Sequence, residues 1–151
     1  MKSKRYWPLF FLAALLLVSC GPSVTTSTSQ ETFVGGECDS GAIRIDMNTT
    51  TQQSVIEGGY PKSCSYFCLW VPESGSSLDI GISRFNVDLD MYIDTDLSVL
   101  ELDDHGQWES NSYGSGNEKV TIEDPGGRYY IQVCSFEGKA STFNIWSEFT
   151  P

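Results

Sequence analysis

The chain has 151 residues, and its twenty acidic residues outnumber nine Lys and Arg, which gives a formal net charge of −11. Three of the cations precede residue 20 and every carboxylate follows it, so the rest of the chain sets six cations against twenty carboxylates, a net charge of −14. Proteins that bind nucleic acid need a basic patch, so this balance argues against a nucleic-acid partner.

Residues 1–19 have the pattern of a secretory signal peptide. Lys2, Lys4 and Arg5 lead into ten apolar residues that end at Val18, a run well short of the about 20 residues that span a bilayer. The run closes in Leu-Val-Ser-Cys-Gly at positions 17–21, which resembles the lipobox of bacterial lipoproteins. The resemblance implies cleavage before Cys20 and acylation of its thiol and new amino group by chains such as palmitate. An ordinary cleaved signal with an incidental cysteine is the alternative.

Residues 20–36 follow as the lipidated cysteine and a tether. Positions 22–32 contain four threonines and three serines without apolar periodicity, a composition that predicts a flexible linker. Residues 37–151 are enough for one domain with one core.

Short runs of alternating apolar and polar residues fill this domain, bounded by Gly, Pro, Asn and Ser. Such alternation predicts half-buried β-strands, and no segment has the apolar stripe of a helix. The runs lie at 42–47, 66–71, 78–83, 85–96, 97–102, 120–122, 129–133 and 143–145, with a polar loop at 103–117. About eight strands predict an all-β, antiparallel β-sandwich.

The run at 85–96, FNVDLDMYIDTD, places aspartates on the side opposite to Val87, Leu89, Met91 and Ile93. Asp88 and Asp90, about 6.5–7 Å apart along one face, are candidate calcium ligands. Calcium needs more oxygens, for which the loop offers Asp103, Asp104 and Asn117. Two other interpretations stay open. The aspartates could bond backbone N–H groups at a corner, or they could form a plain solvent-facing row.

Four cysteines lie beyond Cys20: Cys38, Cys64, Cys68 and Cys134. An even number in an exported domain predicts two disulfides, although a zinc site is a rival interpretation. Cys68 and Cys134 both fall mid-strand on outward positions, which favours a bridge between them if their strands are neighbours. That pairing would leave Cys38 for Cys64.

Several large rings point outward once Leu, Ile, Val and Phe are assigned to the interior. The candidate ligand-binding rings are Trp70, Tyr92, Tyr130 and Trp146; Tyr66, Trp108 and Tyr113 are further outward or loop rings. A contiguous aromatic patch marks a partner site. Alternatively, these rings lie on opposite sheets or cover one another beneath loops.

Catalytic residues are not evident. His105 is the one histidine, it falls in the polar loop, and the chain has no GxSxG motif. We therefore expect a protein that is not an enzyme.

Five segments in register carry a family resemblance: FCLWVP at 67–72, DLDMYI at 88–93, Asn117-Glu118 before VTI, PGGRYYIQV at 125–133, and FNIWSEF at 143–149. Together they resemble the bacterial pre-peptidase C-terminal (PPC) domain over about residues 52–149. The resemblance implies a jelly-roll-like β-sandwich without catalytic activity, usually attached to secreted peptidases. Some relatives in collagenases bind collagen and calcium. No peptidase is attached here, and the four cysteines depart from the pattern.

The function expected from these features is a lipid-anchored binding module of the cell envelope, whose partner is an extracellular protein or polysaccharide. Gly21 after the lipidated cysteine favours the outer membrane. The alternative is an accessory protein for a separately encoded secreted peptidase, acting as a chaperone, targeting domain or inhibitor.

Overall fold

Alternating side chains fill a single interior in the computed structural model, which describes residues 38, 41–59, 63–101, 105–114 and 116–151. The signal peptide at 1–19, Cys20, and the tether predicted within 20–36 lie outside the described residues. Among the described residues, no helix is long and apolar enough to cross a membrane.

Period-two patterning decides which side chains enter the core. In β3 (Cys64–Val71), Phe67 and Leu69 are fully buried, and in β5 (Leu89–Asp94) so are Leu89, Met91 and Ile93. Their polar neighbours along each strand face the other way, because successive side chains of a strand point to opposite faces. The inward assignment made from the sequence is confirmed.

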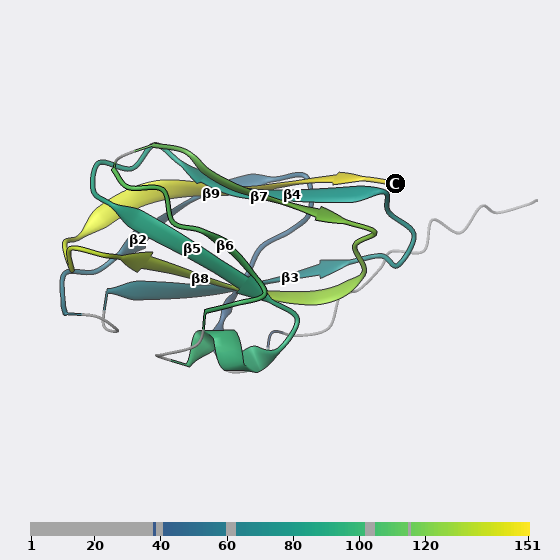
Figure 1. Cartoon of the computed structure of the whole chain (residues 1–151), viewed down its shortest axis with the longest axis horizontal. Helices are drawn as coiled ribbons and strands as arrows, with labels where there is room; N and C mark the ends of the chain where they lie inside the picture. Colours follow the sequence, from purple (N-terminus) through teal and green to yellow (C-terminus); the bar gives the residue numbers. More distant parts are fainter. Residues whose placement is uncertain (1–37, 39–40, 60–62, 102–104, 115) are drawn as a thin grey trace, which may run out of the picture. The chain divides into compact units, whose positions relative to one another are not determined.

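In the described part of the chain, nine strands form two sheets that face each other across this core (Figure 1). The remaining strands are β1 (Ile43–Arg44), β2 (Thr50–Val55), β4 (Ser77–Ser83), β6 (Trp108–Ser110), β7 (Glu118–Glu123), β8 (Gly127–Ser135) and β9 (Ser141–Thr150). The five-stranded sheet has the order β1-β3-β8-β5-β6, and the four-stranded sheet has the order β2-β9-β4-β7. All pairs are antiparallel except β1 with β3. The all-β sandwich prediction is confirmed.

Two local predictions were wrong. The segment 97–102 was expected to be a strand, but Leu97–Leu100 is a 3-10 helix, η2. The side chain of Asp96 caps it by accepting the Ser98 N–H at 2.8 Å, and Val99 is fully buried. The polar loop at 103–117 also contains a short strand, β6, and β2 was not recognised at all because its sequence, TTQQSV, is almost entirely polar.

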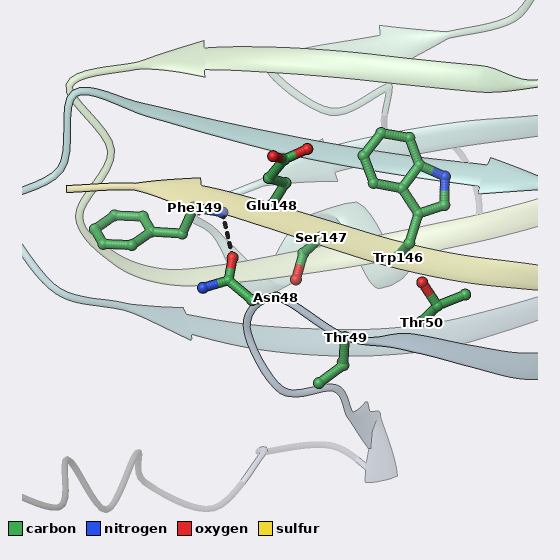
Figure 2. Close-up of a pocket in the computed structure, with 7 residues that line it drawn as sticks. All are labelled: Asn48, Thr49, Thr50, Trp146, Ser147, Glu148 and Phe149. Atoms are coloured by element: carbon green, nitrogen blue, oxygen red, sulfur yellow. Dashed lines mark hydrogen bonds between the residues drawn. The ribbon is translucent and has the colours of Figure 1, made fainter.

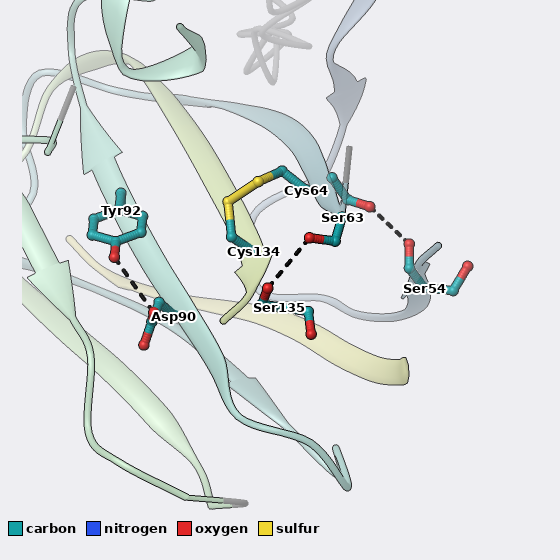
Figure 3. The surroundings of a disulfide bond; sticks show 8 residues. Ser54, Ser63, Cys64, Asp90, Tyr92, Cys134 and Ser135 are labelled. Atoms are coloured by element: carbon teal, nitrogen blue, oxygen red, sulfur yellow. Dashed lines mark hydrogen bonds between the residues drawn. A yellow bond between two sulfur atoms is a disulfide. The ribbon is translucent and has the colours of Figure 1, made fainter. Parts of the chain in front are cut away.

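The four cysteines form two disulfides as predicted, but the favoured pairing was wrong. The bonds join Cys38 to Cys68 and Cys64 to Cys134. Strands β3 and β8 are indeed neighbours, but their register sets Cys64 opposite Cys134 and Cys68 opposite Tyr130. The Cα atoms of Cys64 and Cys134 are only 4.0 Å apart (Figure 3). The register of β3 against β8 decides which cysteines pair, and alternation along one strand does not specify that register.

The loops gather at two ends of the sandwich. Among the described residues, the C-terminal end has 45–49, 72–76, 95–101, 105–107 and 124–126, together with Pro151. The opposite end, here called the Phe136 end, has 56–59, 63, 84–88, 111–114, 116–117 and 136–140. Figure 1 shows the C-terminus at one end, with β9 running toward it from the other.

Candidate functional site

The outer face of the five-stranded sheet carries three of the four rings predicted to bind a ligand: Trp70 on β3, Tyr92 on β5 and Tyr130 on β8. All three point away from the main core, yet Tyr130 is only 5% exposed. It packs with Cys68 and Val99 in a second apolar cluster, against which Tyr92 also lies. Tyr130 is therefore covered, whereas Trp70 and Tyr92 are half-buried.

Two segments cover this face. One is η2, whose Val99 reaches the cluster, and the other contributes Cys38 and Ala42, with Cys38 held against β3 by its disulfide to Cys68. Arg128 adds to the packing, because its guanidinium lies 5.5 Å from the Trp70 ring centroid and donates to the Tyr130 hydroxyl at 3.1 Å. Such cation–π contacts stabilise rings that are partly shielded from water.

Gln132 shows how closed this face is. It lies between Tyr66 and Tyr92 in the strand register and is fully buried, with no hydrogen-bond partner for its amide among the described residues. Sequence alternation places Gln132 outward but cannot show that neighbouring segments bury it.

His105 does not meet a nucleophile in the described part of the chain. Its side chain is 76% exposed, its ring stacks edge-on with Tyr92 at 5.4 Å, and its Nδ1 is 3.9 Å from a Glu109 carboxylate oxygen. All four described cysteines are in disulfides and so have no free thiol.

The two candidate metal ligands lie at the Phe136 end and are buried. The Asp88 carboxylate accepts the Gly114 N–H at 2.8 Å. Asp90 is 8% exposed, and the Tyr92 hydroxyl lies 3.5 Å from its carboxylate (Figure 3). Burial, and then the charges of Asp88 and Glu118, raise the pKa of Asp90 to about 6.

Glu118 is a structural residue that the sequence reasoning did not single out. It is 1% exposed, and its carboxylate accepts hydrogen bonds from the Ser110 hydroxyl and, at 3.4 Å, from the Ser112 N–H. Because Glu118 begins β7 in one sheet and Ser110 ends β6 in the other, these bonds tie the two sheets together. The one sequence feature that pointed to Glu118 was the Asn117-Glu118 pair, which is part of the family resemblance.

Within the described residues, no three His, Cys, Asp or Glu side chains come together as a metal site. Asn117, a predicted further ligand, is exposed. Asp103 and Asp104, the other two, lie outside the described residues.

The outer face of the four-stranded sheet is different. Trp146, the fourth predicted ring, projects from β9 between Thr50 on β2 and Gly81 on β4. A Cβ atom at Gly81 would collide with the indole, so this glycine lets the ring lie close against the sheet. The neighbouring outward side chains are polar, such as Gln52, Asn144 and Asp79.

A surface pocket of about 480 Å³ lies beside Trp146 (Figure 2). Its lining combines one indole with hydroxyl, amide and carboxylate groups: Asn48, Thr49, Thr50, Trp146, Ser147, Glu148 and Phe149. The Asn48 side chain accepts the Phe149 N–H at 2.7 Å, which fixes the loop before β2 against β9.

One solved structure similar to this chain is the pre-peptidase C-terminal domain of a collagenase from Bacillus anthracis. The two are 19% identical with a TM-score of 0.54, and the match covers 74% of this chain and 99% of that domain. The likeness shows that this chain has a PPC-like fold. No protein-family model and no curated protein matches the chain.

Proposed function

We propose that this protein is a lipid-anchored, non-catalytic binding module of the cell envelope, at the outer membrane where the cell has one. Its ligand is a polysaccharide held on the outer face of the four-stranded sheet. The lipobox-like segment around Cys20 supports the anchor, and the PPC-like fold supports a non-catalytic role.

The observation that carries the ligand class is Trp146 beside the pocket. A sugar ring has an apolar face of C–H groups and a polar rim of hydroxyls. An indole offers a flat apolar surface for the former. Hydroxyl and carboxylate side chains such as Thr50 and Glu148 offer donors and acceptors for the latter. Sites of this kind combine an apolar anchor with a few placed polar groups.

The covered rings support the same choice by contrast. Tyr130 is buried where it packs with Val99 of η2 and with Cys38, so a ligand would first have to displace them to reach this ring. Trp146 is half-buried, as Trp70 and Tyr92 are, but it lines the pocket.

Binding to insoluble polysaccharides, measured by depletion from solution, tests the proposal. Trp146→Ala is expected to weaken binding about tenfold or more, while Trp146→Phe keeps a ring and retains part of the affinity. Thr142→Ala on the same strand and face, outside the pocket, is the matched control. Equal binding by Trp146→Ala and the wild type would exclude this site.

An accessory role for a separately encoded secreted peptidase is the second candidate. The observation in its favour is the likeness to a domain of a collagenase. Co-purification of a peptidase from the envelope or the medium with the tagged chain would support it. If Trp146→Ala abolished that co-purification as well, the partner would be a protein bound at the same face.

Calcium at Asp88 and Asp90 is a further proposal, supported by the burial of these two carboxylates near one another. A cation that binds the folded state raises the melting temperature by mass action. Melting with excess calcium and with chelator measures this directly, and identical curves would remove calcium from the function.

A further inference from the structure

The described residues leave five large apolar side chains exposed, and three of them lie in loops at the Phe136 end. Tyr113 is 93% exposed, Phe136 70% and Ile56 65%. The three side chains come from three different loops, which follow β2, β6 and β8 and lie at the same end of the sandwich. Exposed apolar side chains that gather on one surface mark a site of interaction with another surface.

Hydrogen bonds link these loops, and Asp88 of the 84–88 loop connects the loop of Tyr113 to that of Phe136. The Asp88 carboxylate accepts the Gly114 N–H at 2.8 Å, and its main-chain carbonyl accepts the Phe136 N–H at 3.1 Å. The Gly58 N–H donates to the Gly138 carbonyl at 3.0 Å. A side chain at Gly138, whose φ is 67°, would collide with the Gly58 carbonyl, so the two loops approach as closely as glycine allows.

Charge separates this end from the other. Among the described loop residues, the Phe136 end has three carboxylates (Glu57, Asp88, Glu137) and two cations (Arg84, Lys139). The described loops of the C-terminal end have five carboxylates and neither Lys nor Arg: Asp46, Glu73, Asp96, Glu101 and Asp124. An anionic surface would therefore repel the C-terminal end strongly and the Phe136 end little.

We propose that the Phe136 end docks onto a lipid bilayer, with Ile56, Tyr113 and Phe136 inserted among the headgroups. Burying such side chains is favourable because it removes apolar area from water. Tyrosine in particular suits the interface, where its ring is buried and its hydroxyl stays wet. The described loops of this end carry a net charge of −1 (two cations against three carboxylates), with Asp90 and Glu118 buried beneath them, so anionic lipid repels this end less than the C-terminal end.

The position of Cys20 in the chain is compatible with docking onto a bilayer. Seventeen residues separate Cys20 from Cys38, so an anchor at Cys20 keeps Cys38 within about 60 Å of the bilayer even at full extension. Docking itself does not depend on the anchor, because the three side chains belong to the folded domain. It places the sandwich upright, with β9 running away from the membrane and the Trp146 pocket at its far half.

Vesicle sedimentation with the chain from Gly21 onward tests docking without the lipid. This chain keeps every described residue, and all described strands pair among themselves. The probe is vesicles of equal parts phosphatidylethanolamine and phosphatidylglycerol. The triple variant Ile56→Ser, Tyr113→Ser, Phe136→Ser is expected to partition about tenfold or more less strongly than the wild type. The control variant Ile43→Ser, Leu97→Ser removes the two remaining exposed apolar side chains and should partition like the wild type.

A second measurement locates the contact. Phe136→Trp should be quenched by brominated lipid, whereas Leu97→Trp at the C-terminal end should not. Failure of the wild type to sediment with vesicles would overturn the proposal, as would equal loss in the triple variant and the control. Self-association that the triple substitution abolishes, without vesicle binding, would assign this end to a second copy of the chain instead.

Discussion

The two sheets of the sandwich have opposite outer faces. On the five-stranded sheet, a disulfide-bonded segment and η2 bury Tyr130 and partly bury Tyr92. On the four-stranded sheet, the outward side chains are polar and the one large ring, Trp146, lies over Gly81 beside a pocket. The same alternation of residues thus produces one face with a second apolar cluster and one polar face with a single half-buried ring.

This difference gives aromatic residues two roles that their positions in the strands do not distinguish. A ring that projects from a sheet becomes part of a second core where another segment covers it. Where no described segment covers it, the ring can anchor a ligand, as we propose for Trp146.

Removing the cover should have the largest effect on stability. Cys38→Ser with Cys68→Ser opens a loop with a sequence separation of 30 residues. The free energy of unfolding should fall by about 3–4 kcal/mol, since the bond restricts the unfolded chain and holds the segment over Tyr130. Urea unfolding under non-reducing conditions measures this, and an unchanged midpoint would show that the cover contributes no stability.

The two rings should respond differently to truncation. Tyr130→Ala creates a cavity beneath η2 and should cost about 3 kcal/mol of unfolding free energy. Trp146→Ala should cost only about 1 kcal/mol because the indole is half-buried rather than enclosed. Thermal or urea unfolding of the two variants measures both losses of unfolding free energy. Equal losses would contradict the expected difference between the two faces.

Asp90→Asn should stabilise the protein at neutral pH. Its folded-state pKa of about 6 exceeds the usual 3.8, so the folded state binds more protons than the unfolded state between these values, and stability falls as pH rises through this window. Replacing the carboxylate should raise the unfolding free energy by about 1–2 kcal/mol above pH 6, after allowing for solvent screening. Unfolding measured across the window should lose this pH dependence in the variant. If the variant were less stable at neutral pH, the ionised carboxylate of Asp90 would make a contact that stabilises the folded protein.

The smallest effect is expected on the polar face. Lys119 pairs with Asp79 at 2.8 Å, and Thr121 donates to the same carboxylate. These hydrogen bonds, that of Lys119 first, lower the pKa of Asp79, so their contribution is lost as pH falls below the usual aspartate value. Lys119→Ala should cost about 0.5 kcal/mol at neutral pH, as exposed ion pairs do. A loss as large as that of Tyr130→Ala would mean that this face is also a structural one.

The sequence predicted which side of a strand each side chain faces, but it did not predict which strands and cysteines pair. Alternation in 85–96 correctly placed Leu89, Met91 and Ile93 in the core, because a strand's geometry imposes period two. It could not give the register of β3 against β8, which joins residues far apart in the chain and decides which cysteines meet.

The candidate site could be predicted only in part, because alternation gives the direction of a side chain but not the segments that cover it. Trp146 was predicted to point outward, and it does. That Tyr130 is covered follows from the Cys38–Cys68 bond and from η2, both of which depend on long-range contacts. The sheet-bridging hydrogen bonds of Glu118 likewise arise between segments that meet only in the folded chain.

The Cys38–Cys68 bond also sets the route by which mechanical load enters the domain. Tension applied to the chain before Cys38 passes through sulfur into the middle of β3, bypassing the two-residue edge strand β1. From there the Cys64–Cys134 bond shares it with β8. The sheet is thus loaded at its covalently reinforced centre, and the edge strand β1 is not the first to be pulled away.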